Sequence, residues 1–145
     1  MKYSLDNNKI LVSIDKGELV NESILNASRI NNVSFGWING IGAISDPELG
    51  YYDIHNKKYI KKHFEGDFEL TSLIGNITLK DEELFIHSHI TFTDLDFKAY
   101  GGHLFDCRIA AAGEFIIFKG SEKLERHYSS QVGLHIWDCK HDKKN

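Results

Sequence analysis

Apolar and polar residues alternate along most of this chain, with breaks at short clusters of Asn, Asp, Gly and Pro. Alternation with a period of two is typical of a β-strand that buries one face, and the breaks are typical of turns. The clearest turn signals are Asn7-Asn8, Asp46-Pro47 and Glu65-Gly66-Asp67. The pattern therefore predicts strands over residues 3–5, 9–14, 33–44, 49–54, 59–64, 68–79, 84–93, 104–118, 123–127 and 133–137.

One segment, residues 18–31, follows a helical period instead and contains no Gly or Pro. Asp15 is positioned to accept backbone N–H bonds as the N-cap, and Glu18, three residues later, can reach back to it. The sequence thus predicts one helix that starts just after Asp15. The buried face of this helix is expected to consist of Val20, Ile24, Ala27 and Ser28.

One helix packed on a mostly antiparallel sheet defines an α+β fold. The 145 residues suffice for a single domain with a buried core over residues 1–138, followed by a polar tail over residues 139–145. A sheet with this many strands has two faces, and one helix covers only part of one face. The sheet is therefore expected to curl, or the subunits to associate through it.

The charge and the cysteine content of the chain indicate which partners it can bind and in which compartment it lies. The net charge of −4 argues against a general electrostatic grip on nucleic acid, which needs clustered Lys and Arg. Residues 1–6 lack the apolar stretch of a signal peptide, and no apolar run is long enough to span a membrane. With only two cysteines, Cys107 and Cys139, a cytoplasmic protein with free thiols is the simplest expectation.

The most distinctive chemistry lies in the predicted strand at residues 84–93, which carries His87 and His89. Positions i and i+2 of a strand point to the same side, so the two imidazoles are expected to project together from the face opposite the core. A third histidine, His103, follows the pair Gly101-Gly102. Zn²⁺ accepts three histidines and keeps one position open, so this set can form a metal site. A polar surface patch or a subunit interface is the alternative.

Taken in order and spacing, several segments of the chain resemble the plants-and-prokaryotes conserved domain, known as the PPC domain. The resemblance extends from the first predicted strand to about Trp137. It implies a compact α+β domain with a mainly antiparallel, curled sheet of about seven strands and one main helix. It also implies a homotrimer and a stand-alone cytoplasmic protein of the prokaryotic type. The segments are Asn39-Gly40-Ile41-Gly42-Ala43 with Leu49-Gly50-Tyr51-Tyr52-Asp53, Glu69-Leu70-Thr71-Ser72-Leu73-Ile74-Gly75-Asn76-Ile77, His87-Ser88-His89-Ile90-Thr91-Phe92-Thr93-Asp94, Gly101-Gly102-His103-Leu104 and Glu114-Phe115-Ile116.

The resemblance also assigns roles within the site. His87, His89 and His103 match the family's histidine cluster, which is held to bind a metal in some prokaryotic members, and zinc or another divalent transition metal is the expected cofactor. Glu69 lies at a motif position and is the expected catalytic residue, either as a general base or as a group that orients a zinc-bound water. A salt bridge from Glu69 to Arg108 or to a lysine is the alternative.

Plant members of the family join the domain to an AT-hook with an Arg-Gly-Arg-Pro core, and prokaryotic members are often labelled DNA-binding by that association. This sequence has no such tetrapeptide, and Pro47 is its single proline, so duplex binding has little physical support. A DNA-associated role, inherited from the family label, is therefore the third alternative, behind two functions from different classes. The first is a trimeric binding or regulatory module with a small ligand or metal at the histidine cluster. The second is a metal-dependent enzyme of the hydrolase or lyase type that uses the open coordination position.

Overall fold

The computed structural model describes residues 1–139 of the chain, which form nine strands and one helix. Their bounds are β1 (Lys2–Asp6), β2 (Lys9–Asp15), α1 (Val20–Ile30), β3 (Gly36–Asp53), β4 (Lys58–His63), β5 (Asp67–Lys80), β6 (Glu83–Thr93), β7 (Ala99–Lys119), β8 (Glu125–Ser129) and β9 (Leu134–Trp137). The predicted alternation of strands with short turns is thus confirmed over most of the chain.

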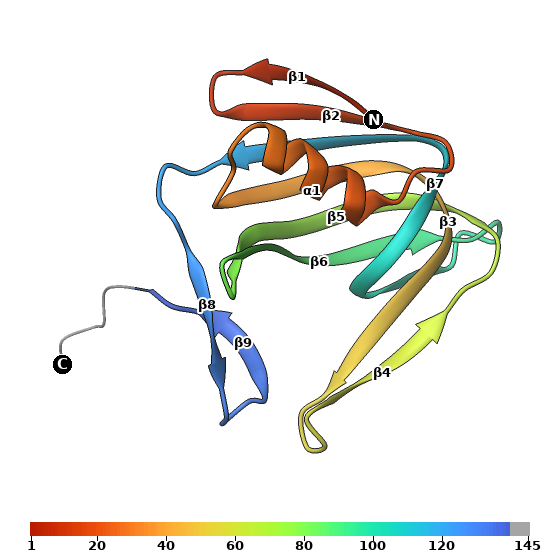
Figure 1. Cartoon of the computed structure of the whole chain (residues 1–145). Coiled ribbons are helices and arrows are strands. Elements are labelled where there is room, and N and C mark those ends of the chain that lie inside the picture. The colour runs from red at the N-terminus through yellow and green to blue at the C-terminus, as the bar shows by residue number, and fades with distance from the viewer. Residues whose placement is uncertain (140–145) are drawn as a thin grey trace.

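All nine strands belong to one sheet, in which neighbours are antiparallel except for the parallel pair β5 and β8. The sheet order is β1-β2-β7-β3-β5-β8-β9, and β4 pairs with β3. Strand β6 pairs with both β5 and β7, so the ladder of β7, β3, β5 and β6 closes on itself. In Figure 1, α1 lies across one side of this closed part, while β4 and the hairpin of β8 and β9 project away from it at the bottom of the view. The expected curling of the sheet is confirmed.

The apolar core lies between α1 and the inner side of the curled sheet. Ile24 and Ala27 of α1 are fully buried against it. Strand β6 shows how alternation places the polar side chains, because Ser88, Ile90 and Phe92 are buried while His89, between Ser88 and Ile90, is exposed. Burial of the apolar positions therefore fixes the histidines on the outer side of β6.

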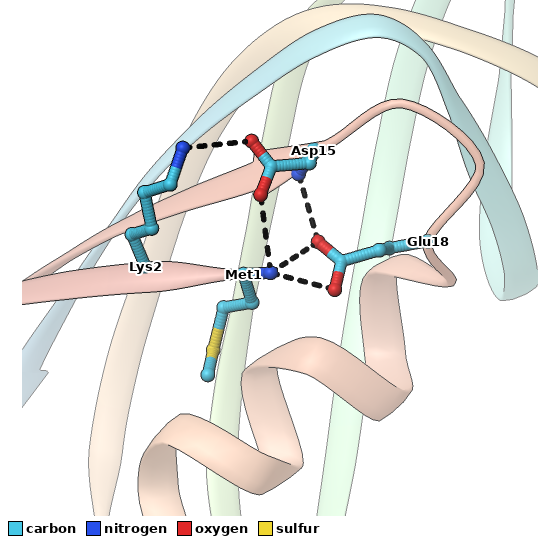
Figure 2. A network of polar contacts seen from close by, with 4 residues as sticks. All are labelled: Met1, Lys2, Asp15 and Glu18. Carbon is cyan, nitrogen blue, oxygen red and sulfur yellow. Dashed lines mark hydrogen bonds and ion pairs between the residues drawn. The ribbon is translucent and has the colours of Figure 1, made fainter.

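The predicted N-cap at Asp15 is wrong, because α1 begins at Val20 and Leu19 occupies the N-cap position without a side-chain hydrogen bond. The carboxylates of Asp15 and Glu18 instead contact the ammonium group of Met1 at 3.4 Å and 2.6 Å, as Figure 2 shows. Glu18 also accepts a hydrogen bond from the backbone N–H of Asp15 at 2.8 Å. These contacts hold both carboxylates in the turn before the helix, so neither reaches the first helical N–H groups.

The predicted chain reversal at Asp46-Pro47 is also wrong, because β3 runs without a break from Gly36 to Asp53. Asp46 has a φ of 50°, and the register of β3 against β7 shifts between Ser45 and Glu48. The turn-forming residues therefore produce a bulge, which bends the strand and lets its second half pair with β4.

Strand β7 begins at Ala99 rather than at the predicted Leu104, and it continues through the small residues Ala110-Ala111-Ala112-Gly113. The pair Gly101-Gly102 and His103 are therefore strand residues, not a loop. This extended first part of β7 pairs with β6 and closes the ladder.

The α+β class with one helix is confirmed for residues 1–139, with nine strands in place of about seven. No helix within these residues is long and apolar enough to cross a membrane. The predicted polar tail, residues 139–145, lies outside the described residues apart from Cys139.

Candidate metal centre

Two neighbouring strands bring the three predicted ligands together. His87 and His89 lie on β6, and His103 on β7 stands directly opposite His89 in the antiparallel register. The approach of the two strands requires glycine, because a Cβ atom at Gly101 would lie 2.8 Å from the carbonyl oxygen of Ile90. The glycine at position 101, two residues before His103, is therefore needed for the close packing of β7 against β6.

The three imidazoles are close enough to share one ion. Their ligand nitrogens all lie within 4.8 Å of one another. The ring centroids are 5.2 Å apart for His87 and His89, 5.2 Å for His87 and His103, and 5.6 Å for His89 and His103. Zn–N bonds of about 2.0–2.1 Å place tetrahedral ligand atoms about 3.4 Å apart. Rotation of the rings closes the difference of at most about 1.4 Å and leaves a fourth position open.

The surroundings keep two of these imidazoles neutral, which is the form that binds metal ions. Burial lowers the pKa of His87 to about 4, and the positive charge of Arg126 acts in the same direction. Burial likewise lowers the pKa of His103 to about 4, with His87 as the next cause. The Nδ1 atom of His103 is buried and has no hydrogen-bond partner within residues 1–139. An unpaired buried nitrogen is costly, and a metal ion would supply the missing partner.

A pocket of about 380 Å³ adjoins His87 and His103. Its walls are formed by residues of the six strands β4 to β9 and by Asn21 of α1. Tyr59 of β4 stacks on the His103 ring, with 4.8 Å between centroids and 31° between planes. Phe105 of β7 meets the same ring edge-on at 5.2 Å. The His103 imidazole is therefore held by aromatic neighbours as well as by its strand.

Glu69 lies away from the three histidines. It is exposed near the start of β5 and pairs with Thr93, which is four residues beyond His89 on β6. Four strand residues span about 13 Å. The structure therefore does not bring Glu69 to the histidine cluster of the same chain. The alternative partner Arg108 instead donates a hydrogen bond to the carbonyl oxygen of Gly17 at 2.8 Å.

Arg126 also lines the pocket, although no sequence motif pointed to it. Its Nη2 group donates to Oδ1 of Asn76 at 2.8 Å, and Asn76 lies opposite His87 in the register of β5 and β6. A single arginine in a short strand near the C-terminus belongs to no recognisable sequence motif. Only the parallel pairing of β8 with β5 places it beside the histidines.

The two lowered pKa values predict a pH-dependent stability for the metal-free protein. In the unfolded chain, His87 and His103 return to a pKa of 6.5, whereas in the folded chain it is about 4. Between these values the unfolded chain binds more protons, so the contribution to stability is complete above pH 6.5 and is lost as the pH falls toward 4. We expect the urea midpoint of chelator-treated protein to fall between pH 7 and pH 5. The His87→Asn/His103→Asn double variant should fall less, and an equal decrease would contradict the assignment.

The features so far define a class, namely a small α+β protein with three clustered histidines beside a pocket. The model of the Plants and Prokaryotes Conserved (PCC) domain matches residues 1–121. The chain therefore belongs to this family, which is also abbreviated PPC. The resemblance seen in the sequence motifs is confirmed.

Solved structures agree with this assignment. A Bacteroides thetaiotaomicron protein, provisionally described as DNA-binding, is 34% identical with a TM-score of 0.91, over 94% of this chain and 96% of that one. The plant- and prokaryote-conserved protein of Pyrococcus horikoshii is 32% identical, with a TM-score of 0.85 over 97% and 96% of the two chains. A metal-containing protein of Archaeoglobus fulgidus is 31% identical, with a TM-score of 0.84 over 94% and 96%. No curated protein matches the chain.

Proposed function

We propose that this chain is a metal-binding module in which His87, His89 and His103 hold one divalent transition metal. Zinc fits the donor set best, because it accepts three neutral imidazoles and needs no further protein ligand. The observation that carries the proposal is the convergence of these imidazoles from two strands, with the buried Nδ1 atom of His103 unpaired. A bound zinc would supply a Lewis acid and an acidic water at the open position.

The chain's own residues would present that position to a small ligand. Tyr59 and Phe105 hold the His103 ring, and the adjoining pocket of about 380 Å³ admits a small molecule. The metal site and the ligand pocket are therefore adjacent, as expected of a binding or regulatory module. The related protein of Archaeoglobus fulgidus is metal-containing, which supports the proposed metal.

The enzymatic alternative finds less support. Hydrolase or lyase chemistry beside a metal needs a group that moves a proton, and Glu69 was expected in that role. Glu69 on β5 pairs with Thr93, which lies about 13 Å along β6 from His89, and no carboxylate of residues 1–139 lines the pocket. We therefore favour binding over catalysis.

Charge and thiols bear on the partner and the compartment. We do not extend the DNA-binding description of the Bacteroides thetaiotaomicron relative to this chain, because the net charge of −4 and the lack of an arginine arm give duplex binding little physical support. We place the protein in the cytoplasm, because both Cys107 and Cys139 are free thiols.

We also propose that the chain assembles as a homotrimer through the outer face of its sheet. Large apolar side chains are exposed there, a surface that a monomer rarely leaves to water. Light scattering is expected to give three times the chain mass of 16.6 kDa. A monomer mass, or a mass that Ile41→Asp leaves unchanged, would remove this face as the interface. The exposed residues are Leu11 (45%), Trp37 (41%), Ile41 (54%), Ile74 (46%) and Phe118 (38%).

Elemental analysis tests the metal proposal directly. The protein is purified without a histidine tag or chelator, and its metals are measured by plasma mass spectrometry. We expect about one zinc or other transition metal per chain. Chelator treatment should remove it, and added zinc should restore it at the same ratio. Protein that contains no metal and takes up none would leave the histidines with a packing or interface role.

A further inference from the structure

Arg126 of β8 is a half-buried cation fixed at the wall of the pocket. Its Nε donates to Oγ1 of Thr78 at 2.8 Å, its Nη2 to Oδ1 of Asn76 at 2.8 Å, and its Nη1 to the carbonyl oxygen of His135 at 2.9 Å. Its Cζ lies 5.1 Å from the centroid of the Phe85 ring. Three of its five N–H groups are thus used, and both Nη atoms keep one donor each.

No carboxylate of residues 1–139 pairs with the Arg126 guanidinium. The partners that hold Arg126 are all neutral, and residues 1–139 supply it with no carboxylate. The pocket wall contains a second cation, Lys80, which lies beside Arg126 in the register of β5 and β8. Asp and Glu of residues 1–139 are absent from the wall. Partly buried cations without counter-charges are costly, and an anion would offset that cost.

We propose that this pocket binds a small organic carboxylate, with the carboxylate group on Arg126 and Lys80 and the rest of the molecule reaching toward the histidine cluster. The inference rests on the proposed metal function and specifies the ligand of the same site. A guanidinium with a free donor on each Nη atom matches the two oxygens of a carboxylate. Tyr59, Phe85 and Phe105 offer ring faces and edges to an apolar body. The volume of about 380 Å³ fits a small molecule rather than a peptide or nucleic acid.

Arg126 also ties the hairpin of β8 and β9 to β5, so a test must separate anion binding from this structural role. Nuclear magnetic resonance of the zinc-loaded full chain, labelled with ¹⁵N-arginine, meets this need. The sequence contains three arginines, Arg29, Arg108 and Arg126, so two internal controls lie outside the pocket. Benzoate is the probe, neutral benzamide is its matched control, and inorganic phosphate is the competing anion.

Benzoate is expected to shift the Nε–H signal of Arg126 in a saturable manner and to leave the signals of Arg29 and Arg108 unchanged. Benzamide should cause no such shift, and phosphate should bind less tightly because it lacks an apolar body. Equal effects of benzoate and benzamide would overturn the anion site. Tighter binding of phosphate would overturn the assignment to carboxylates.

Variants give a second measurement by calorimetry. The Lys80 side chain makes no hydrogen bond within residues 1–139, and Lys80→Gln is expected to weaken benzoate binding several-fold. Arg126→Gln is expected to weaken it at least tenfold. Lys58→Gln, an exposed change on β4, should have no effect. Unchanged benzoate affinity in both pocket variants would overturn the proposal. If wild-type protein takes up no zinc, the metal function fails, and the Arg126 signal of the metal-free chain still decides whether the pocket binds carboxylates.

Discussion

Replacing His103 by alanine is expected to weaken zinc binding by more than about 100-fold. Loss of a hydrogen-bonded neighbour of a metal ligand already costs about 10–100-fold, and loss of one of three ligands costs more. His103 is the decisive choice, because it lies opposite His89 and within 5.2 Å of His87 between ring centroids. The measurement is competition for zinc with a chromophoric chelator, together with the metal content of the purified variant.

The matched control for this change is His63→Ala. His63 is an exposed histidine at the end of β4 and does not belong to the histidine cluster. We expect its zinc affinity to equal that of the unchanged protein. Equal losses in the two variants, or none in His103→Ala, would show that zinc binds elsewhere.

Replacing Phe92 by alanine is expected to lower the free energy of unfolding by about 3–5 kcal/mol. Phe92 is fully buried in β6 and packs against three aromatic rings, with centroid distances of 5.2 Å to Phe64, 4.9 Å to Phe68 and 5.8 Å to Tyr100. Truncation removes these contacts and leaves a cavity that the closed ladder cannot readily fill. Urea unfolding of the chelator-treated protein measures the loss.

The neighbouring exposed residue Thr91 offers the control, since Thr91→Ala is expected to change the free energy of unfolding by less than about 0.5 kcal/mol. Zinc affinity of the folded Phe92→Ala protein should be retained, because its side chain and the histidines point to opposite sides of β6. A loss below 1 kcal/mol for Phe92→Ala would mean that the aromatic cluster is not part of the cooperative core.

Period-two alternation was sufficient to predict where His87 and His89 point. The burial of Ile90 and Phe92 fixes the face of β6, and this information is local. The position of Gly101 just before His103 is also visible in the sequence, and this glycine permits the close approach of β7 to β6. These parts of the site could be predicted because residues close in sequence determine them.

Other features depend on contacts between residues that are distant in sequence, and no local sequence pattern predicts these contacts. The Asp46-Pro47 segment has the composition of a turn, but pairing of β3 with β5 and β7 keeps the strand continuous and converts the turn into a bulge. The cap expected at Asp15 was displaced by an ion pair with the Met1 ammonium. Arg126 reaches the pocket only through the pairing of β8 with β5. Such long-range pairing overrides local preference.

The antiparallel pairing of β6 with β7 has an entropic consequence. His89 and His103 face each other across a hairpin with a sequence separation of 14 residues, whereas the pair Gly36 and Lys119 of β3 and β7 is separated by 83 residues. Loop closure scales with the logarithm of chain length, so bringing the ligands together costs about 1.6 kcal/mol less conformational entropy than joining those strand ends. The metal centre is therefore assembled by a hairpin between consecutive strands, whereas the pairing of β3 with β7 joins distant parts of the chain.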